Sequence, residues 1–302
     1  MISADVTPAV GSAASSPSAG AGTRAATYRR MLRWWPLAVL AVAAFTAAFP
    51  YVLAPNHPDA THLVARLKGP GTVVNGTDYL LGTDSLGRDV LSRVIWGTRI
   101  SMVVAVIAVV AGGVVGSLLG ILAGTRRKIL GTVIMRFADM VLSIPFFLLA
   151  ILVVAILGPS LVNTVIVLAT VRWPRYARVA FGQTLEAHSR EFVKSSVAVG
   201  VGPWRLFSRH ILPEVLPSLI VVATLEVGLM IIYEAALSFI GLGAQPPTPS
   251  WGAMLSEGQQ FVASSWWIAT FPGVALFIIV VSVNRLGDLL RDRLDPRERS
   301  QR

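Results

Sequence analysis

The side chains in this 302-residue chain that are best placed to do chemistry are carboxylates within apolar sequence. Glu226 and Glu234 interrupt an apolar run at about 214–242, and Asp139 lies in another run. A carboxylate within a membrane is costly, so it usually lines a path, carries a proton or faces a wet cavity or helix partner. Glu234 is therefore a candidate gate or pathway residue. A proton-coupled secondary transporter that uses all three acids is one interpretation.

An intramembrane enzyme is another interpretation, and the sequence offers little support for it. Such an enzyme needs a nucleophile with a base, or a set of metal ligands, at membrane depth. His57 and His62 fall in one polar segment and His188 and His210 in another, so none accompanies the acids. The chain has no cysteine and no G-x-x-x-x-G-K-[ST] sequence, which excludes thiolate metal sites and a P-loop for ATP. We expect no catalytic residue, cofactor or metal in this chain.

Membrane-spanning helices have to position the acids, because the composition lies outside the range of soluble domains. Hydrophobic residues make up 54% of the chain and charged residues only 14%. The net charge is +10, but the basic residues lie mostly at the ends of apolar runs. That placement indicates topology signals and not a nucleic-acid surface. We therefore expect an all-α polytopic membrane protein.

The apolar runs predict six transmembrane helices, each of about 20 residues. We expect 1–33 to be a disordered basic cytoplasmic tail, 34–55 the first transmembrane helix, and 56–98 an extracytoplasmic segment. A five-helix core follows at 99–285, and 286–302 forms a second cytoplasmic tail. The runs in the core lie at about 100–124, 133–157, 161–173, 214–242 and 266–283. The positive-inside rule places both termini in the cytoplasm.

Two of these predicted helices carry features that affect packing. In the run at 100–124, glycines at every fourth residue give one small face, either for plain packing or for a neighbour that slides. These are Gly112, Gly116, Gly120 and Gly124. In the run at 133–157, Arg136 and Asp139 are spaced for an ion pair, and Pro145 is placed to kink the helix.

A basic polar loop at 182–213 separates the fourth and fifth runs. Apolar residues recur at near-helical spacing on both sides of Gly200-Val-Gly-Pro203, which predicts two short amphipathic helices joined by a turn. Gly200 is the position where a left-handed backbone is easiest. On physical grounds the loop is either a docking surface or a segment lying on lipid headgroups.

Three stretches resemble one family of membrane proteins. Residues 81–93, LGTDSLGRDVLSR, are similar to the G-T-D-x-L-G-R-D-V-L-S-R signature of permeases of dipeptide, oligopeptide and nickel ABC importers. Residues 234–252, EAALSFIGLGAQPPTPSWG, are similar to a second signature of that branch. Aligned on Gly200, the loop resembles the EAA loop of ABC-importer permeases. Lys194-Ser195-Ser196 stand at E-A-A and His210 at the first position of I-x-L-P, and all four depart from that pattern.

The resemblance implies the second-type permease subunit of such an importer, with the type I, MetI-like fold, in the bacterial plasma (inner) membrane. It implies a homologous second permease, two cytoplasmic subunits that hold ATP and magnesium, an extracytoplasmic solute-binding protein and surrounding lipid, and no nucleic acid. The chain would then be a transport subunit and not an enzyme. Peptides are the expected cargo, with a nickel chelate or another small solute as the alternative.

The resemblance also assigns candidate sites. Residues expected to couple to the ATPase subunits are Lys194, Ser195, Ser196, Gly200, Trp204, Phe207, His210, Leu212 and Pro213. Candidates for the pathway or outer gate are Glu234, Ser238, Phe239, Gly241, Gly243 and Trp251. The Pro-rich turn that carries Trp251 is expected at the extracytoplasmic mouth, with the indole exposed on a docking rim for the binding protein.

Overall fold

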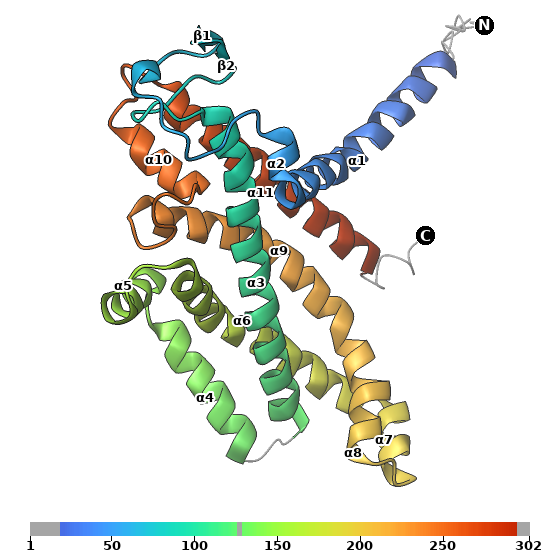
Figure 1. Cartoon of the computed structure of the whole chain (residues 1–302). Coiled ribbons are helices and arrows are strands. Elements are labelled where there is room, and N and C mark those ends of the chain that lie inside the picture. The colour runs from blue at the N-terminus through green and yellow to red at the C-terminus, as the bar shows by residue number, and fades with distance from the viewer. Residues whose placement is uncertain (1–18, 126–128, 295–302) are drawn as a thin grey trace, which may run out of the picture. The chain divides into compact units, whose positions relative to one another are not determined.

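The computed structural model describes residues 19–125 and 129–294 (Figure 1). The chain divides into two units, 1–35 and 36–302. All the sites considered below lie in the second unit.

Both predicted tails are helical in the parts that the structure describes. Helix α1 (Ala19–Ala48) begins well before the predicted first span, so the prediction of a disordered tail is wrong for 19–33. Alanine and arginine favour a helix there, and no proline interrupts the sequence until Pro36. The last helix, α11 (Trp267–Leu294), likewise extends into the predicted tail at 286–302. Residues 1–18 and 295–302 lie outside the described residues.

The predicted extracytoplasmic segment 56–98 contains a small β-hairpin, an exception to the all-α expectation. Strand β1 (Thr72–Val74) pairs antiparallel with β2 (Thr77–Tyr79). Asn75 and Gly76 between them have φ values of 51° and 79°, as a two-residue hairpin turn requires. Segment 56–98 also contains the 3₁₀ turn η1 (Leu63–Ala65), and the short helix α2 (Pro50–Leu53) precedes it.

Helices make up the remainder of the described chain, and one predicted span is broken. The helices are α3 (Val90–Thr125), α4 (Ile129–Ser143), α5 (Phe146–Leu157), α6 (Leu161–Ser189), α7 (Glu191–Ala198), α8 (Pro203–Leu206), the π-helical turn η2 (Phe207–Ile211), α9 (Leu212–Phe239), α10 (Trp251–Gln259) and α11. The run at 133–157 was expected to be one kinked helix, but α4 and α5 meet at 88°. Pro145 disfavours the α conformation at the residue before it, and Pro145 itself is extended with a ψ of 131°, so the helix stops.

Among the described residues, three helices are long and apolar enough to cross a membrane. They are α3, the helical stretch Pro203–Phe239 that includes α9, and α11, and the bent pair of α4 and α5 is a fourth candidate. The apolar helical stretch Trp34–Ala48 of α1 is shorter. Helix α6 was expected to continue beyond the apolar run at 161–173, and it does so as far as Ser189.

The glycine face of α3 packs closely against α6, as expected. A Cβ atom on Gly116 would lie 2.2 Å from the Trp173 carbonyl oxygen, and one on Gly120 would lie 2.3 Å from the Ala177 carbonyl oxygen. Gly112 and Gly124 complete the face, against Ala169 and Thr184. The partner residues follow one another along α6 in the same order as the glycines along α3, so the two helices run parallel. Buried side chains of α3, α6, α9 and α11 form one apolar core.

Candidate coupling loop and charged clusters

The loop after α6 folds as two short helices joined by a left-handed turn, as predicted. Gly200 has a φ of +83°, and a Cβ atom there would meet nothing within 4 Å. The backbone conformation, and not lack of space, therefore favours glycine. At the base of the loop, the Arg190 guanidinium bonds to the Glu214 carboxylate at 2.7 Å, which ties the end of α6 to the start of α9.

The loop has a buried side and an exposed apolar side. Val193, Leu206 and Ile211 are buried against the helical core. On the other side, Val199 is 85% exposed and Trp204 is 76% exposed. Other predicted loop residues are also partly or fully accessible, namely Lys194, Ser195, Ser196, Phe207, His210, Leu212 and Pro213. Exposed apolar groups on a rigid turn suit a protein-docking surface.

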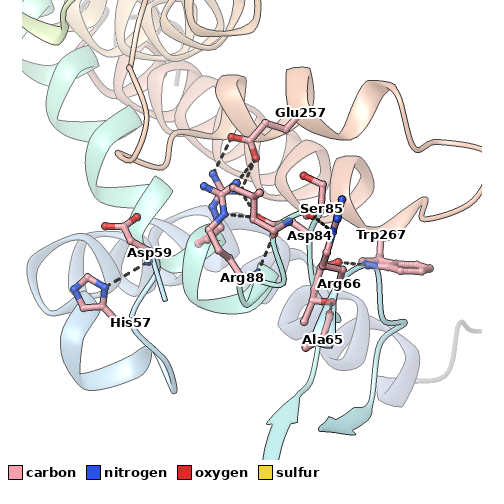
Figure 2. A network of polar contacts seen from close by, with 12 residues as sticks. His57, Asp59, Ala65, Arg66, Asp84, Ser85, Arg88, Glu257 and Trp267 are labelled. Atoms are coloured by element: carbon pink, nitrogen blue, oxygen red, sulfur yellow. Dashed lines mark hydrogen bonds and ion pairs between the residues drawn. The ribbon is translucent and has the colours of Figure 1, made fainter. Parts of the chain in front are cut away.

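Near the N-terminal end of α3, four charged side chains form a largely buried network, here called the outer charge cluster (Figure 2). Its members are Asp84, Arg88, Arg93 and Glu257. Asp84 Oδ2 accepts from Arg88 Nε at 2.6 Å and from Arg93 Nη1 at 2.7 Å. Glu257 accepts from Arg88 Nη2 at 2.8 Å and from both terminal nitrogens of Arg93, at 2.6 and 3.1 Å. The charges balance, and sequence alone did not connect Glu257 to the 81–93 signature.

A tight turn before α3 positions Asp84. Its second oxygen, Oδ1, accepts from the backbone N–H groups of Leu86 and Arg88 at 2.8 and 2.9 Å. Gly87 has a φ of +75°, and a Cβ atom there would collide with the His62 carbonyl oxygen. The Trp267 indole at the start of α11 donates to the Thr83 carbonyl at 3.0 Å. The turn is thus fixed by elements from three parts of the sequence.

Trp251 is buried, so the prediction of an exposed indole on a docking rim is wrong. Its side chain is 1% exposed and its Nε1 donates to the Val94 carbonyl at 3.1 Å. Ser250 caps α10 by accepting from the Ala253 N–H at 3.2 Å, and this start of the helix directs the indole toward α3. Gly97 leaves room for the ring, since a Cβ atom there would lie 2.9 Å from Trp251 Cδ1.

Glu234 is enclosed within this chain and fully hydrogen-bonded. It accepts from Ser101 Oγ on α3 at 2.7 Å and from Ser238 Oγ at 2.8 Å. Ser238 Oγ in turn accepts from the Ala244 N–H at 3.1 Å, and a side chain on Gly243 would strike it. The carboxylate therefore joins α3, α9 and the loop after α9. The other two gate candidates differ from it, because Phe239 and Gly241 are exposed at the end of α9.

A second charged group lies midway along α6 and α9, here called the central charge cluster: Arg172, Arg175 and Glu226. Glu226 is 1% exposed, and its oxygens lie 3.4 Å from Arg172 Nε and 3.1 Å from Arg175 Nε. The Arg172 guanidinium also lies over the Tyr233 ring, 4.7 Å from its centre. Sequence patterns singled out Glu226 but did not connect it to either arginine.

Asp139 is paired differently from the prediction. Its Oδ1 bonds to Arg178 Nη2 on α6 at 2.6 Å, and not to Arg136 on its own helix. Among the described residues, no group of three or more His, Asp or Glu side chains could hold a metal ion. The four acids discussed here, Asp84, Asp139, Glu226 and Glu234, are each paired with cations or hydroxyl groups.

The helical arrangement is similar to solved membrane transporters. An inward-facing structure of the MetNI methionine ABC transporter gives a TM-score of 0.55 at 22% identity, covering 68% of this chain and 96% of that chain. An amino acid ABC transporter solved with histidines gives a TM-score of 0.52 at 15% identity, covering 67% of this chain and 94% of that chain. At these identities the likeness concerns the fold alone. It shows that the chain shares the helical fold of these ABC-transporter structures, which confirms the predicted fold type.

Sequence comparisons define the family. The family described as binding-protein-dependent transport system inner membrane component matches residues 116–300. The di/tripeptide transport system permease protein DppC of Pseudomonas aeruginosa is 42% identical over 254 residues, 84% of each chain. The glutathione transport system permease protein GsiD of Pectobacterium atrosepticum is 43% identical over 222 residues, 74% of each chain. This chain belongs to the same family of multi-pass inner-membrane permeases, as its signatures predicted.

Proposed function

We propose that this chain forms half of the translocation pathway of an ATP-driven importer of dipeptides and longer peptides. The observation that carries the proposal is the identity of 42% over most of the chain to a permease named for di- and tripeptides. A relative named for glutathione, itself a small peptide, supports the same cargo class. A nickel chelate or another small solute is the alternative cargo.

The proposal includes the partners and the topology. A homologous second permease completes the pathway, two cytoplasmic subunits bind and hydrolyse ATP with magnesium, and an extracytoplasmic binding protein delivers the peptide. Six spans are proposed: α1, α3, the bent pair of α4 and α5, α6, α9 and α11. This arrangement puts both termini and the loop at 182–213 in the cytoplasm. The Arg- and Lys-rich composition of those parts supports it.

The loop at 182–213 is proposed as the coupling element. Nucleotide-driven closure of the ATPase subunits has to act on the membrane helices through a stiff contact. Val199 and Trp204 offer exposed apolar anchors on a turn, while Arg190 and Glu214 fix its base. The outer mouth is assigned to the other end of α9, with Glu234 and Ser238 as the buried hinge of the gate.

The experiment that tests the coupling role compares two glycines of the same turn. Gly200→Val should be strained by about 1–3 kcal/mol, because a β-branched residue has to adopt a φ of +83°. Gly202→Val is the matched control, since Gly202 has a φ of −62° and equally open surroundings. We expect both variants to insert in the membrane. Only Gly200→Val should lose co-purification with the ATPase subunits or ATP-dependent uptake.

Two outcomes would contradict this assignment. If Gly200→Val retained both the ATPase subunits and full uptake, the loop would not be the coupling element. If both valine variants lost the ATPase subunits equally, the left-handed turn would have no special part in docking. Trp204→Ala should act in the same direction as Gly200→Val, but more mildly, because it removes one apolar anchor and leaves the turn intact.

A further inference from the structure

The central charge cluster lies at membrane depth. Gly116 of α3 packs on Trp173 and Gly120 packs on Ala177, so Arg172 and Arg175 are level with this part of α3. Since the two helices run parallel, the depth of these arginines can be measured along α3. No charged residue occurs in α3 between Ile100 and Thr125.

The distances along α3 place the central charge cluster inside the hydrocarbon region of a bilayer. At 1.5 Å per residue, Gly116 is about 24 Å from Ile100 and about 12 Å from Gly124. The hydrocarbon core of a bilayer is about 30 Å thick. A charge at this depth is stable only when it faces a protein partner or water.

The charges of this cluster are not balanced. Arg172 and Arg175 share the single carboxylate of Glu226. The Glu226 oxygens have ion-pair contacts but no hydrogen bond within the described residues. The Arg175 side chain is 51% exposed on this chain, whereas Arg172 is only 14% exposed and lies over the Tyr233 ring. One guanidinium is therefore available to a further anion.

The central charge cluster lies close to a break between two helices. Tyr233 stacks on Phe146, the first residue of α5, with ring centres 4.4 Å apart. The backbone before Phe146 is non-helical, and α4 and α5 meet there at 88°. Non-helical backbone at membrane depth is tolerated where it is buried in protein or lines a water-filled cavity. The break therefore contacts the central charge cluster through Tyr233 and Arg172. Together with the half-exposed Arg175 of the same cluster, it favours a water-filled path over contact with lipid.

We propose that Arg175 binds the C-terminal carboxylate of the peptide as it crosses the membrane. The guanidinium offers a planar pair of N–H donors that matches a carboxylate. Glu226 neutralises one of the two arginines, which leaves a single excess positive charge that can hold an anion and still release it. Arg172, held by Glu226 and Tyr233, is a positioning residue. The inference rests on the proposed function, because the ligand is the imported peptide.

The test uses the complete transporter in proteoliposomes and two labelled cargoes. One is a tripeptide with a free carboxylate and the other is its C-terminal amide, chosen so that the isolated binding protein binds both. The variant is Arg175→Gln. The matched control is Arg178→Gln, on the same helix with a similarly exposed side chain (54%) that is paired with Asp139. Arg175→Lys serves as the conservative variant.

We expect Arg175→Gln to reduce uptake of the free peptide about tenfold and to change uptake of the amide by less than about twofold. Arg175→Lys should restore part of the preference for the free carboxylate, and Arg178→Gln should leave the ratio of the two cargoes unchanged. The inference is overturned if both cargoes decline together in Arg175→Gln, which would indicate an ion pair with a partner subunit, or if the ratio does not change. Failure of the wild-type transporter to import either cargo would instead overturn the proposed function.

Discussion

The outer and central charge clusters contain the same side chains, arginines and carboxylates, but they are built differently. In the outer cluster two arginines face two acids, and the contacts are hydrogen bonds of 2.6–3.1 Å. In the central cluster two arginines share Glu226 at 3.1 and 3.4 Å, without hydrogen-bond geometry. Arg93 is buried, whereas Arg175 is half-exposed.

The difference teaches how to separate a structural ion pair from a functional one. A network in which every charged side chain has an opposite charge at hydrogen-bond distance favours one conformation, because breaking a contact weakens the pairing of a buried charge. A cluster with an excess charge and an accessible guanidinium is open to another ligand. We therefore expect the outer cluster to stabilise the fold, and we propose that the central cluster lines the path.

The largest expected effect is on the outer cluster. Arg93→Ala removes the more buried of the two cations that contact Asp84 and Glu257, so it should lower the free energy of unfolding by about 3–5 kcal/mol. Arg66→Ala is the control, because Arg66 is exposed in the same segment and donates only to the Ser85 carbonyl. It should change stability by less than about 1 kcal/mol. Thermal unfolding of the purified permease measures the stability of both variants. Equal unfolding midpoints would show that the outer charge cluster does not stabilise the fold.

A slightly smaller effect is expected at Trp251, which joins α10 to α3 beside the outer cluster. Trp251→Ala should cost about 3–4 kcal/mol, since it leaves a cavity but no unpaired charge. Basal and substrate-stimulated ATP turnover should fall together as the protein loses stability. If the variant kept its unfolding midpoint and lost only the stimulated turnover, the indole would instead act in docking of the binding protein.

The smallest effect on stability is expected in the central cluster. Arg175→Gln should change the free energy of unfolding by less than about 1 kcal/mol, because the side chain is half-exposed and Arg172 remains to pair with Glu226. Its effect on uptake of free-carboxylate peptides should nevertheless be large. Unfolding midpoints of Arg175→Gln and Arg93→Ala, measured together, sharpen the comparison. A loss of stability at Arg175 as large as that at Arg93 would make the two clusters equivalent.

Sequence reasoning was most successful where a local pattern decides the structure. The spacing of glycines predicted a close helix contact along one face of α3, and the Gly200 turn predicted a left-handed backbone between two short helices. The signatures predicted the family and the fold type. These features depend on residues that are close in sequence or repeat along one helix face.

It was least successful where distant residues decide the structure. Glu257 lies more than 160 residues from Arg93, and its part in the outer cluster has no local signal. Trp251 was expected to be exposed because a Pro-rich turn precedes it. The space that its indole fills is beside Gly97, which belongs to another helix. Asp139 was paired with Arg136 by spacing, although Arg178 reaches it from α6. The break at Pro145 was underestimated as a kink, since proline can bend or end a helix.

Transport by the reconstituted system tests the proposed function, in which this chain forms half of the membrane pathway of an ATP-driven peptide importer. The permease is reconstituted in proteoliposomes with its partner permease, the ATPase subunits and the binding protein, and uptake of a labelled dipeptide is followed. The account predicts accumulation only when ATP and all four kinds of subunit are present. Accumulation driven by a proton gradient in vesicles that lack the ATPase subunits would contradict it and would favour a proton-coupled transporter.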